Sequence, residues 1–331
     1  MKILVTGAYG NVGQSTLNEL IAKGHDVTAF DSDTARNRNL CLRFRKKIRQ
    51  VWGDIRDATA VERAVTGQDC VIHLAAVIPP LSILKPSLAE SVNIDGTRNV
   101  INAAERQVHK PDLIYASSIA IYGNRLANPL ILATDEPHPN DDDEYAKHKL
   151  RCEGILKASS LNWLILRLTY IVSARRAAPD ALMFEMPPET SIEICDTRDT
   201  GLAFANAAER SSVRKAILNI AGGEKCRILY REYLQQMLEI FGLGWNTLPR
   251  FAFSHRGYHC GFMDTAESQR LLEYQRVTIE DYFCEVRQIW KSKKFFIRLF
   301  RPFIISWLLR SSPYYRKATG IGLFHPVNAR I

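Results

Sequence analysis

The chain has 331 residues, 46% of them hydrophobic, so it can bury a large core and is long enough for a main domain with a smaller lobe. Its seven cysteines are odd in number and show no C-x-x-C spacing, which argues against a disulfide framework or a zinc site. The formal net charge is +9, and a first strand that begins almost at residue 1 argues against a secretory signal peptide, so we expect a cytoplasmic protein with reduced thiols.

A glycine-rich turn follows the first predicted strand. The apolar run Ile3-Leu4-Val5 leads into Thr6-Gly7-Ala8-Tyr9-Gly10-Asn11-Val12-Gly13, and a helix is predicted over 14–23 with a stop at Gly24. Glycines in this pattern let the backbone turn sharply, approach a phosphate and pack the helix tightly on the sheet. Because a helix N-terminus attracts anions, the segment predicts a cradle for a dinucleotide pyrophosphate.

The second predicted strand, 25–30, ends at Asp31. A dinucleotide-binding unit places at this point the acid that bonds the adenosine ribose hydroxyls, which favours NAD over NADP because a 2′-phosphate would meet a carboxylate. Seven basic residues follow, and they form either a solvated basic helix or a source of one cation that pairs with a phosphate. These residues are Arg36, Arg38, Arg43, Arg45, Lys46, Lys47 and Arg49.

A Tyr-x-x-x-Lys spacing follows the acidic loop 141–144, which we interpret as a solvated turn at the rim of a pocket rather than a metal site. Tyr145 and Lys149 would share one face of a helix. Tyrosine titrates near pH 10, so a tyrosine that acts as a base needs its phenolate stabilised at a pH roughly two or three units lower. The ammonium of Lys149 and an oxidised nicotinamide ring can do this by their charge.

The C-terminal segment 286–331 carries ten lysines or arginines and no acid, whereas residues 1–285 hold 34 basic and 35 acidic residues. Within it, 293–310 mixes aromatic, aliphatic and cationic residues and is too short and too charged to span a bilayer. The interface of an anionic membrane suits residues 291–317. A helix packed on its own core and a dimer contact are the alternatives, and the apolar content argues against nucleic acid.

Together these motifs resemble the NAD-dependent epimerase/dehydratase family of the extended short-chain dehydrogenase/reductase superfamily, which includes UDP-galactose 4-epimerase. The matches run in the family's order: Gly53-Asp54-Ile55 after the third strand, His73-Leu74-Ala75-Ala76 in the fourth, Asn93-Ile94-Asp95-Gly96-Thr97, and Ser117-Ser118 with Tyr122-Gly123 at the fifth. The resemblance implies a Rossmann-type doubly wound parallel α/β sheet over 1–170 with a return near 216–222, a substrate lobe at 171–285 and a basic amphipathic segment at 286–331.

The resemblance also implies roles for individual residues. It assigns catalysis to Ser118, Tyr145 and Lys149, with Ser118 aligning the substrate hydroxyl, and it implies a homodimer through the helices that carry Asn93 and Tyr145. The residues it places on NAD, together with those of the glycine turn, are Gly7, Tyr9, Gly10, Asn11, Val12, Gly13, Asp31, Asp54, Ile55, Leu74, Ala75, Ala76, Asn93, Tyr145 and Lys149. The substrate candidates are Ser117, Ser118, Arg198, Arg227, Arg256 and Tyr258.

Departures from the family pattern bear on the reaction. Dehydratases and decarboxylases of the superfamily carry acids just after the serine position, where this chain has Ile119 and Ala120, so elimination lacks its usual catalyst. Arg167-Leu168 replaces Arg-Pro, and Asp199-Thr200-Gly201 replaces Asp-Val-Ala. Hydride transfer with a proton shuttle remains.

Three functions follow. The first is an NAD-dependent epimerase that oxidises a nucleotide-activated sugar transiently to a ketone. The second is a membrane-associated NAD(P)-dependent dehydrogenase or reductase, because 115–119 and the apolar 77–81 also resemble the 3β-hydroxysteroid dehydrogenase branch. The third is a non-catalytic NAD-sensing scaffold, which an intact Ser118, Tyr145 and Lys149 set argues against.

Overall fold

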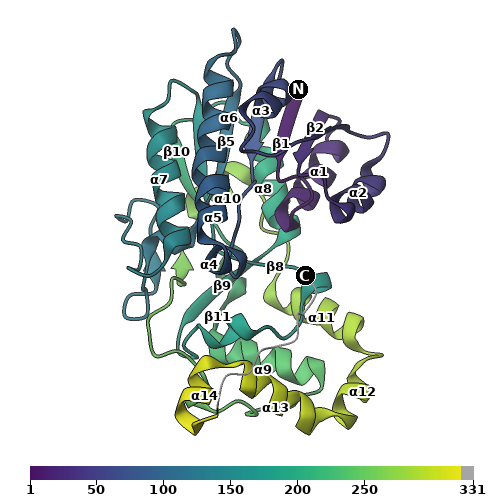
Figure 1. Cartoon of the computed structure of the whole chain (residues 1–331), viewed down its shortest axis with the longest axis vertical. Helices are drawn as coiled ribbons and strands as arrows, with labels where there is room; N and C mark the ends of the chain where they lie inside the picture. Colours follow the sequence, from purple (N-terminus) through teal and green to yellow (C-terminus); the bar gives the residue numbers. More distant parts are fainter. Residues whose placement is uncertain (322–331) are drawn as a thin grey trace.

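The structure is a computed structural model, and it describes residues 1–321. Arg330 of the predicted basic C-terminal segment lies outside the described residues. The fold has two parts, a large layered domain and a smaller lobe that the C-terminal helices cover (Figure 1).

A seven-stranded parallel sheet forms the centre of the large domain, in the order β10-β7-β5-β4-β1-β2-β3. This order confirms the predicted Rossmann-type sheet, with its switch point between β1 and β4. The strands are β1 (Lys2–Thr6), β2 (Asp26–Asp31), β3 (Arg49–Trp52), β4 (Cys70–His73), β5 (Asp112–Ser118), β7 (Trp163–Leu168) and β10 (Ala216–Ile220).

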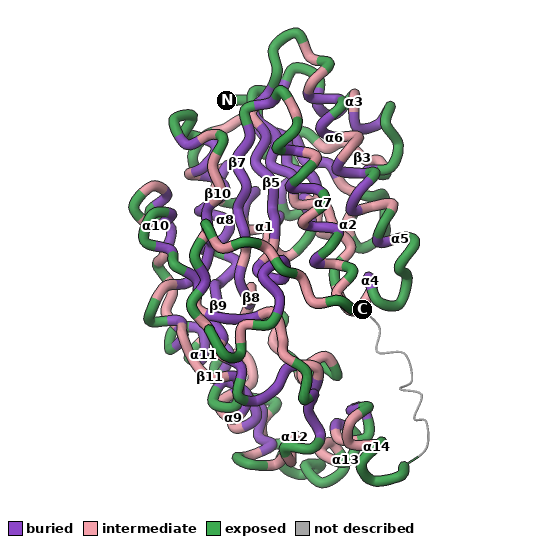
Figure 2. Tube along the Cα trace, turned by 90° about the vertical axis from the view of Figure 1, so that its left-hand side faces the viewer, coloured by how far each residue is buried: buried purple, intermediate pink, exposed green. Residues whose placement is uncertain are grey.

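Helices cover both faces of the sheet, and each face has its own buried cluster (Figure 2). One cluster contains Leu17, Leu20 and Phe204, and the other contains Val61, Val100 and Leu156. The helices of the first face are α1 (Asn11–Ala22), α2 (Ala35–Cys41), α8 (Thr197–Glu209) and α10 (Ala266–Leu272); those of the second are α3 (Ala58–Val65), α6 (Gly96–Glu105) and α7 (Glu144–Ala158). Two short helices, α4 (Leu81–Leu84) and α5 (Pro86–Glu90), and a π-helical turn (Ser91–Asp95) precede α6.

The lobe is built on a three-stranded sheet, β11-β9-β8, and a third buried cluster of aromatic, methionine and leucine side chains. Its elements are β8 (Tyr170–Val172), β9 (Ser191–Asp196), β11 (Arg227–Leu229), α9 (Tyr230–Phe241), α11 (Ile279–Trp290), α12 (Lys294–Leu299), α13 (Arg301–Ser311) and α14 (Pro313–Thr319). A two-stranded ribbon of β6 (Leu130–Ile131) and β12 (Phe262–Met263) lies beside it.

The chain returns from the lobe to the large domain with α8, before β10. A Cβ atom at Gly201 of α8 would lie 2.6 Å from the backbone carbon of Ser15, so glycine allows α8 to pack closely against α1. The predicted helix over 14–23 begins earlier, at Asn11, because Gly10 is already the residue at its N-terminal boundary.

No helix within residues 1–321 is both long enough and apolar enough to cross a membrane. The predicted core contact of the C-terminal segment is present, since Leu308 is fully buried and Ile304, Ile305 and Leu309 pack against the lobe cluster. The same segment also exposes large apolar side chains on its outer side.

Candidate active site

The turn from β1 into α1 is shaped by two glycines. Gly7 has a φ of +65°, and a Cβ there would lie 2.8 Å from the backbone of Ala75. A Cβ at Gly13 would lie 2.3 Å from the carbonyl oxygen of Gly7. Because neither position tolerates a side chain, the loop can press against the end of β4 and keep the N-terminus of α1 open.

The N-terminus of α1 has no side-chain cap. Gly10 N–H donates to the Gly7 carbonyl at 3.0 Å, but within residues 1–321 no protein acceptor is found for the N–H groups of Asn11 and Val12. The first turn of a helix leaves such donors for an anion. This open end fits the pyrophosphate of the predicted dinucleotide.

Asp31, at the end of β2, lies beside the same turn. Its carboxylate accepts the Tyr9 N–H at 2.8 Å, the Ser32 N–H at 2.8 Å and the Asn37 side-chain amide at 3.1 Å. Burial raises the pKa of Asp31, although these donors oppose the rise. A carboxylate held in this way fits the ribose hydroxyls of the predicted dinucleotide. Tyr9 itself offers only backbone, because its ring is buried against Trp52.

Three of the basic residues after Asp31 have contacts or line a cavity near this turn: Arg36, Arg38 and Arg43. Arg38 is held by Asp33 at 2.5 Å, and Arg43 donates to Gln14 at 3.0 Å. Arg36 and Arg43 line a cavity of about 430 Å³ at the N-termini of α1 and α8, together with Arg175, Arg176 and Arg198. Cations therefore lie close to the predicted phosphate site and could pair with a phosphate. The carboxylate of Asp31 is the feature that favours NAD over NADP.

A buried hydrogen-bond chain fixes the loop after β4, where Leu74, Ala75 and Ala76 were predicted to meet the cofactor. Thr6 and Thr97 hydrogen-bond the two ring nitrogens of His73 at 2.7 and 3.0 Å. Thr97 donates to the carbonyl of Asn93 at 2.5 Å, and the Asn93 side chain bonds both backbone groups of Val77 at 2.7 and 3.0 Å. Asn93 thus braces the loop.

His73 is expected to make the protein sensitive to acid. Burial lowers the pKa of His73 from 6.5 to about 3. Between these two pH values the unfolded chain binds a proton at this side chain and the folded chain does not. The contribution of the neutral His73 to the unfolding free energy is fully present above pH 6.5 and is lost as the pH falls. Between pH 7 and pH 5, the unfolding free energy of the wild type should fall about 2 kcal/mol more than that of His73→Gln. Urea denaturation at both pH values measures this, and equal losses would contradict a neutral buried imidazole.

Asp54 and Ile55 lie beyond β3. Asp54 is paired with Arg56, with a shortest distance of 2.5 Å, and this pairing holds the pKa of Asp54 below its usual range. Ile55 is 7% exposed and fits against Gly96, where a Cβ would lie 2.6 Å from its side chain. Ile55 therefore helps to position α6. Asp54 forms an ion pair with Arg56 beside the end of β3.

Tyr145, Lys149 and Ser118 converge as predicted from the sequence. Lys149 is 4% exposed, donates to the carbonyl of Ala116 at 2.7 Å and lies 5.8 Å from the centre of the Tyr145 ring. Burial lowers the pKa of Lys149 to about 8. Burial also raises the pKa of Tyr145, which a hydrogen bond with Ser118 partly offsets. The phenolate of Tyr145 therefore requires positive charge beside it.

Two helix-capping contacts position this group. Asp143 caps α7 by accepting the Ala146 N–H at 2.9 Å, and its other oxygen is 2.6 Å from Nδ1 of His259 in the lobe. Ser118 accepts the Ala120 N–H at 3.2 Å and so caps the 3₁₀ turn 119–122. The helix with the candidate base is thereby tied to the lobe.

Ser117 does not face the cleft, and it belongs to a buried network that sequence reasoning missed. Its hydroxyl donates to Glu153 at 2.6 Å. Glu153 in turn binds Arg167 through two hydrogen bonds of 3.0 and 2.8 Å, and both side chains are at most 2% exposed. Burial raises the pKa of Glu153, but Arg167 outweighs it and holds that pKa below its usual range. The sequence feature that could have indicated this network is Arg167, a single arginine within the otherwise apolar strand 163–168.

A cleft of about 510 Å³ lies above Tyr145 and separates the large domain from the lobe. One wall is the segment 79–86 with α4, and the other comes from the lobe and from Tyr314 of α14. Arg256 and Tyr258, two of the substrate candidates from the sequence, line it. Each of its four acids already has a partner: Asp142 with Arg256, Asp143 with His259, Glu144 with Lys147 and Glu185 with Tyr314.

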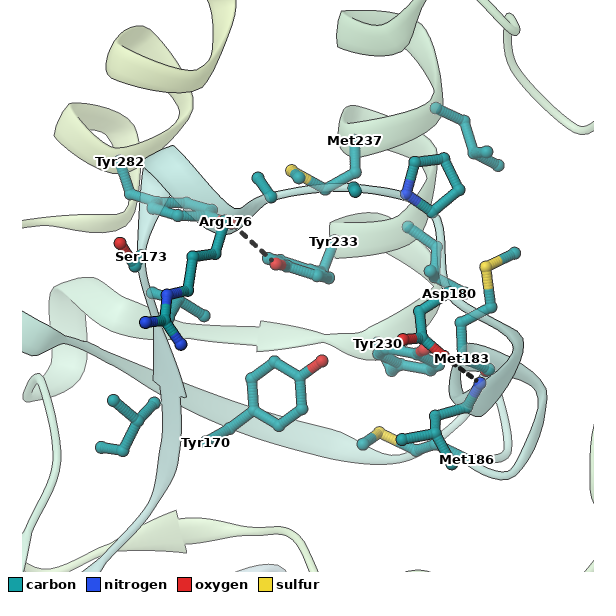
Figure 3. Close-up of a pocket in the computed structure, with 18 of the residues that line it drawn as sticks. Tyr170, Ser173, Arg176, Asp180, Met183, Met186, Tyr230, Tyr233, Met237 and Tyr282 are labelled. Carbon is teal, nitrogen blue, oxygen red and sulfur yellow. Dashed lines mark hydrogen bonds between the residues drawn. The ribbon is translucent and has the colours of Figure 1, made fainter. Parts of the chain in front are cut away.

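A second cavity, of about 300 Å³, extends from Asn11 into the lobe. Tyrosines and methionines dominate its lining, and Arg176 is the cation that points into the drawn space (Figure 3). Leu182 and Tyr258 line both this cavity and the cleft. The two spaces therefore adjoin, and together they give room for more than a single sugar at Tyr145.

Two of the predicted substrate arginines are neutralised within the lobe. Arg227 is 2.9 Å from the fully buried Glu193 and also donates to the Met263 carbonyl at 3.0 Å. Arg198 is held by Asp196 and Glu285, both at 2.8 Å, and Asp196 raises its pKa further. Neither lines the cleft at Tyr145. Within residues 1–321 no group of acidic, histidine or cysteine side chains forms a metal site.

Comparisons with known proteins agree with this geometry. A family model described as the NAD dependent epimerase/dehydratase family matches residues 3–186. A 4-epimerase of N-acetyl-alpha-D-glucosaminyl-diphospho-ditrans,octacis-undecaprenol from Escherichia coli O157:H7 is 36% identical over 156 residues, which cover 47% of this chain and 42% of that protein. A UDP-glucose 4-epimerase from Lactobacillus helveticus is 27% identical over 199 residues, 58% of each chain. The chain thus spans about half the length of these curated relatives.

Among solved structures, a mutant of a UDP-glucuronic acid 4-epimerase from Bacillus cereus, in complex with NAD and UDP-4-deoxy-4-fluoro-glucuronic acid, superposes with a TM-score of 0.74. The match covers 88% of this chain and 100% of that one at 20% identity. At that identity, the likeness establishes the shared fold.

Proposed function

The chain belongs to the NAD-dependent epimerase/dehydratase family, whose cofactor is NAD, and from this we propose that it epimerises a diphosphate-activated sugar. The observation that carries the proposal is the convergence of Lys149 and Ser118 on Tyr145, which lines the cleft. The cradle of Gly7 and Gly13, the open end of α1 and the carboxylate of Asp31 fit the cofactor.

Tyr145, Ser118 and Lys149 have different roles in the proposed reaction. The Tyr145 phenolate removes the proton of a substrate hydroxyl, and Ser118 aligns that hydroxyl by a hydrogen bond. The Lys149 ammonium stabilises the phenolate by its charge. NAD, which the glycine turn, the open end of α1 and the carboxylate of Asp31 would hold, would supply the acceptor and donor of hydride for the carbinol carbon. Tyr145 then gives its proton back to the new alkoxide, so atoms and electrons balance without a further reactant.

Epimerisation fits better than elimination. An elimination needs a second acid or base at the neighbouring carbon. Ile119 and Ala120 cannot hold a proton and are at most 3% exposed. The four acids of the cleft are engaged with the partners described above. Tyr145 is therefore the proposed proton carrier.

The sequence predicts a nucleotide as the carrier of the sugar, and the relative from Lactobacillus helveticus is named for such a substrate. The relative from Escherichia coli is named for a sugar on a lipid diphosphate. A dehydrogenase that releases its ketone is the second candidate function, favoured by the apolar wall 79–86 of the cleft. These possibilities differ in what enters the cleft beside the sugar.

We also propose two assemblies. One is a homodimer through α7 and the π-helical turn that carries Asn93, which sedimentation velocity would detect as twice the mass of the chain. The other is a cytoplasmic protein held at the inner face of the membrane by residues 291–317. The exposed apolar and basic side chains of that segment support the second assembly.

The test of the proposed function begins with the purified protein. Mass spectrometry after denaturation should find NAD retained at about one molecule per chain, because an epimerase regenerates its cofactor. Incubation with a panel of UDP-hexoses and UDP-N-acetylhexosamines, or the same sugars on farnesyl diphosphate, should form an epimer without net NADH. Protein that is empty, and that accumulates NADH with an oxidised product, would instead identify a dehydrogenase.

A further inference from the structure

The segment 291–317 is held firmly on the lobe by its inner side. Ser312 donates to the carbonyl of Ala252 at 2.5 Å, and the Tyr315 ring stacks on Phe251 at 5.6 Å. Tyr314 donates to Glu185 at 2.6 Å and lines the cleft. The C-terminal helices are therefore packed on the lobe and are not a loose tail, and the last of them, α14, borders the cleft through Tyr314 (Figures 1 and 2).

The outer side of the segment, which we call the tail surface, is apolar and exposed. Within residues 1–321, six of the large hydrophobic side chains with high exposure lie between 295 and 307: Phe295 (73%), Phe296 (64%), Leu299 (66%), Phe300 (53%), Phe303 (75%) and Trp307 (43%). Phe303 and Trp307 are four residues apart on α13 and share a face. Exposed aromatic side chains gathered within two successive helices in this way mark a docking site.

The segment that carries the tail surface is also positively charged. Lys294 and Arg298 approach Glu239 at 3.1 and 3.7 Å. The remaining cations of the segment make no ion pair with any residue from 1 to 321, and no acid lies between 286 and 321; these cations are Lys291, Lys293, Arg301, Arg310, Arg316 and Lys317. Aromatic side chains between unpaired cations suit an anionic bilayer, where the rings enter the interface and the cations meet headgroups.

A second exposed apolar group lies at the mouth of the cleft. Ile83 and Leu84 of α4 line the cleft and are 67% and 72% exposed, and the nearby Ile78 is 57% exposed. Tyr314, from the C-terminal segment, stands on the other wall. A nucleotide gains little from such a lip, because its ribose and phosphates need polar partners. A hydrocarbon chain that leaves the cleft would be shielded from water by it.

We propose that the tail surface docks on an anionic membrane and that the sugar diphosphate is carried by a lipid of that membrane. The assignment rests on the proposed epimerase function and narrows its substrate to lipid-linked sugars. The sugar lies at Tyr145, the lipid leaves along the lip of Ile78, Ile83 and Leu84, and the tail surface keeps the enzyme beside the bilayer.

Membrane docking is tested first, by sedimentation of the full chain with phosphatidylcholine vesicles and with vesicles containing about 30% phosphatidylglycerol, an anionic fraction that gives the surface a negative potential. We expect binding to the anionic vesicles, and about tenfold weaker binding for Phe303→Glu. Val108→Glu is the matched control, since Val108 is 94% exposed on the large domain and the variant adds the same charge. It should bind as the wild type does. No wild-type binding, or equal losses in both variants, would overturn the docking.

The charge contribution has its own arm. Lys291→Gln and Lys317→Gln should each weaken binding to the anionic vesicles by about fivefold and leave binding to phosphatidylcholine unchanged. If Phe303→Glu instead converts a dimer to a monomer in sedimentation velocity without affecting vesicle binding, the tail surface is a contact between copies of the chain and the proposal fails.

The carrier is tested by kinetics with one sugar presented on two carriers, UDP and farnesyl diphosphate. We expect kcat/KM to be at least about tenfold higher for the isoprenoid carrier. Ile83→Ser/Leu84→Ser should remove that preference by lowering kcat/KM for the isoprenoid carrier more than for UDP. A preference for UDP would overturn the carrier assignment and leave the epimerase intact. Turnover of neither would overturn the epimerase and with it the carrier, whereas vesicle binding does not depend on either.

Discussion

Replacing Tyr145 by phenylalanine is expected to lower the rate of epimerisation by about a thousandfold, within the range of general acid–base catalysis. The phenol oxygen is the only group lost. Its loss removes the proton acceptor at the floor of the cleft, while the glycine cradle and Asp31 are untouched. NAD should therefore remain bound at about one molecule per chain, as mass spectrometry of the denatured variant would show.

Tyr115 provides the matched control for this prediction. Its ring lies 4.8 Å from the Lys149 ammonium, against 5.8 Å for the Tyr145 ring. Tyr115 is buried, whereas Tyr145 is partly exposed. Tyr145 lines the cleft, whereas Tyr115 is enclosed in the core between the sheet and α7. Tyr115→Phe should keep turnover within a few-fold of the wild type. Full activity in Tyr145→Phe would refute the proposed mechanism.

The largest loss of stability is expected from Arg167→Met. Arg167 is 2% exposed and Glu153 is fully buried, so the variant leaves a carboxylate without its main counter-charge in the core. Breaking a buried pair in this way costs about 3 to 5 kcal/mol of unfolding free energy. Chemical denaturation at neutral pH would measure it.

Two further variants separate the buried charge from other effects. Lys157 also pairs with Glu153, at 3.3 Å, but its side chain is 38% exposed, so Lys157→Met should cost less than about 1 kcal/mol. The double variant Glu153→Leu/Arg167→Met removes both charges and should recover much of the loss. A double variant as unstable as Arg167→Met alone would show that packing, not charge, holds this region.

The nucleotide end of the site could be predicted from the sequence because its signals are local. Gly7, Gly13 and Asp31 stand at set distances within one strand-helix-strand unit, and Tyr145 and Lys149 share one helix turn. The fold confirms the unit, and the structure brings Ser118 to Tyr145 as expected. The family's order of motifs extended this interpretation to Asn93.

The substrate end could not be predicted in the same way. Arg198 and Arg227 were candidates for a diphosphate, but their charges are neutralised by Glu285 and Glu193, which approach through the fold from distant positions in the chain. The inner and outer sides of α13 were also inseparable by pattern, since apolar residues surround the helix on most sides and only the position of the lobe decides which are covered.

The spacing of Tyr145, Lys149 and Glu153 along α7 limits which insertions and deletions the site can tolerate. Tyr145, Lys149 and Glu153 repeat every four residues along α7 and meet three consecutive residues of β5: Ser118, Ala116 and Ser117. One inserted or deleted residue between them would rotate part of the set by about 100° and break the base, its cation and the buried pair together. Substitutions on the solvent side of α7 are therefore compatible with the site, whereas an insertion or deletion between 145 and 153 is not.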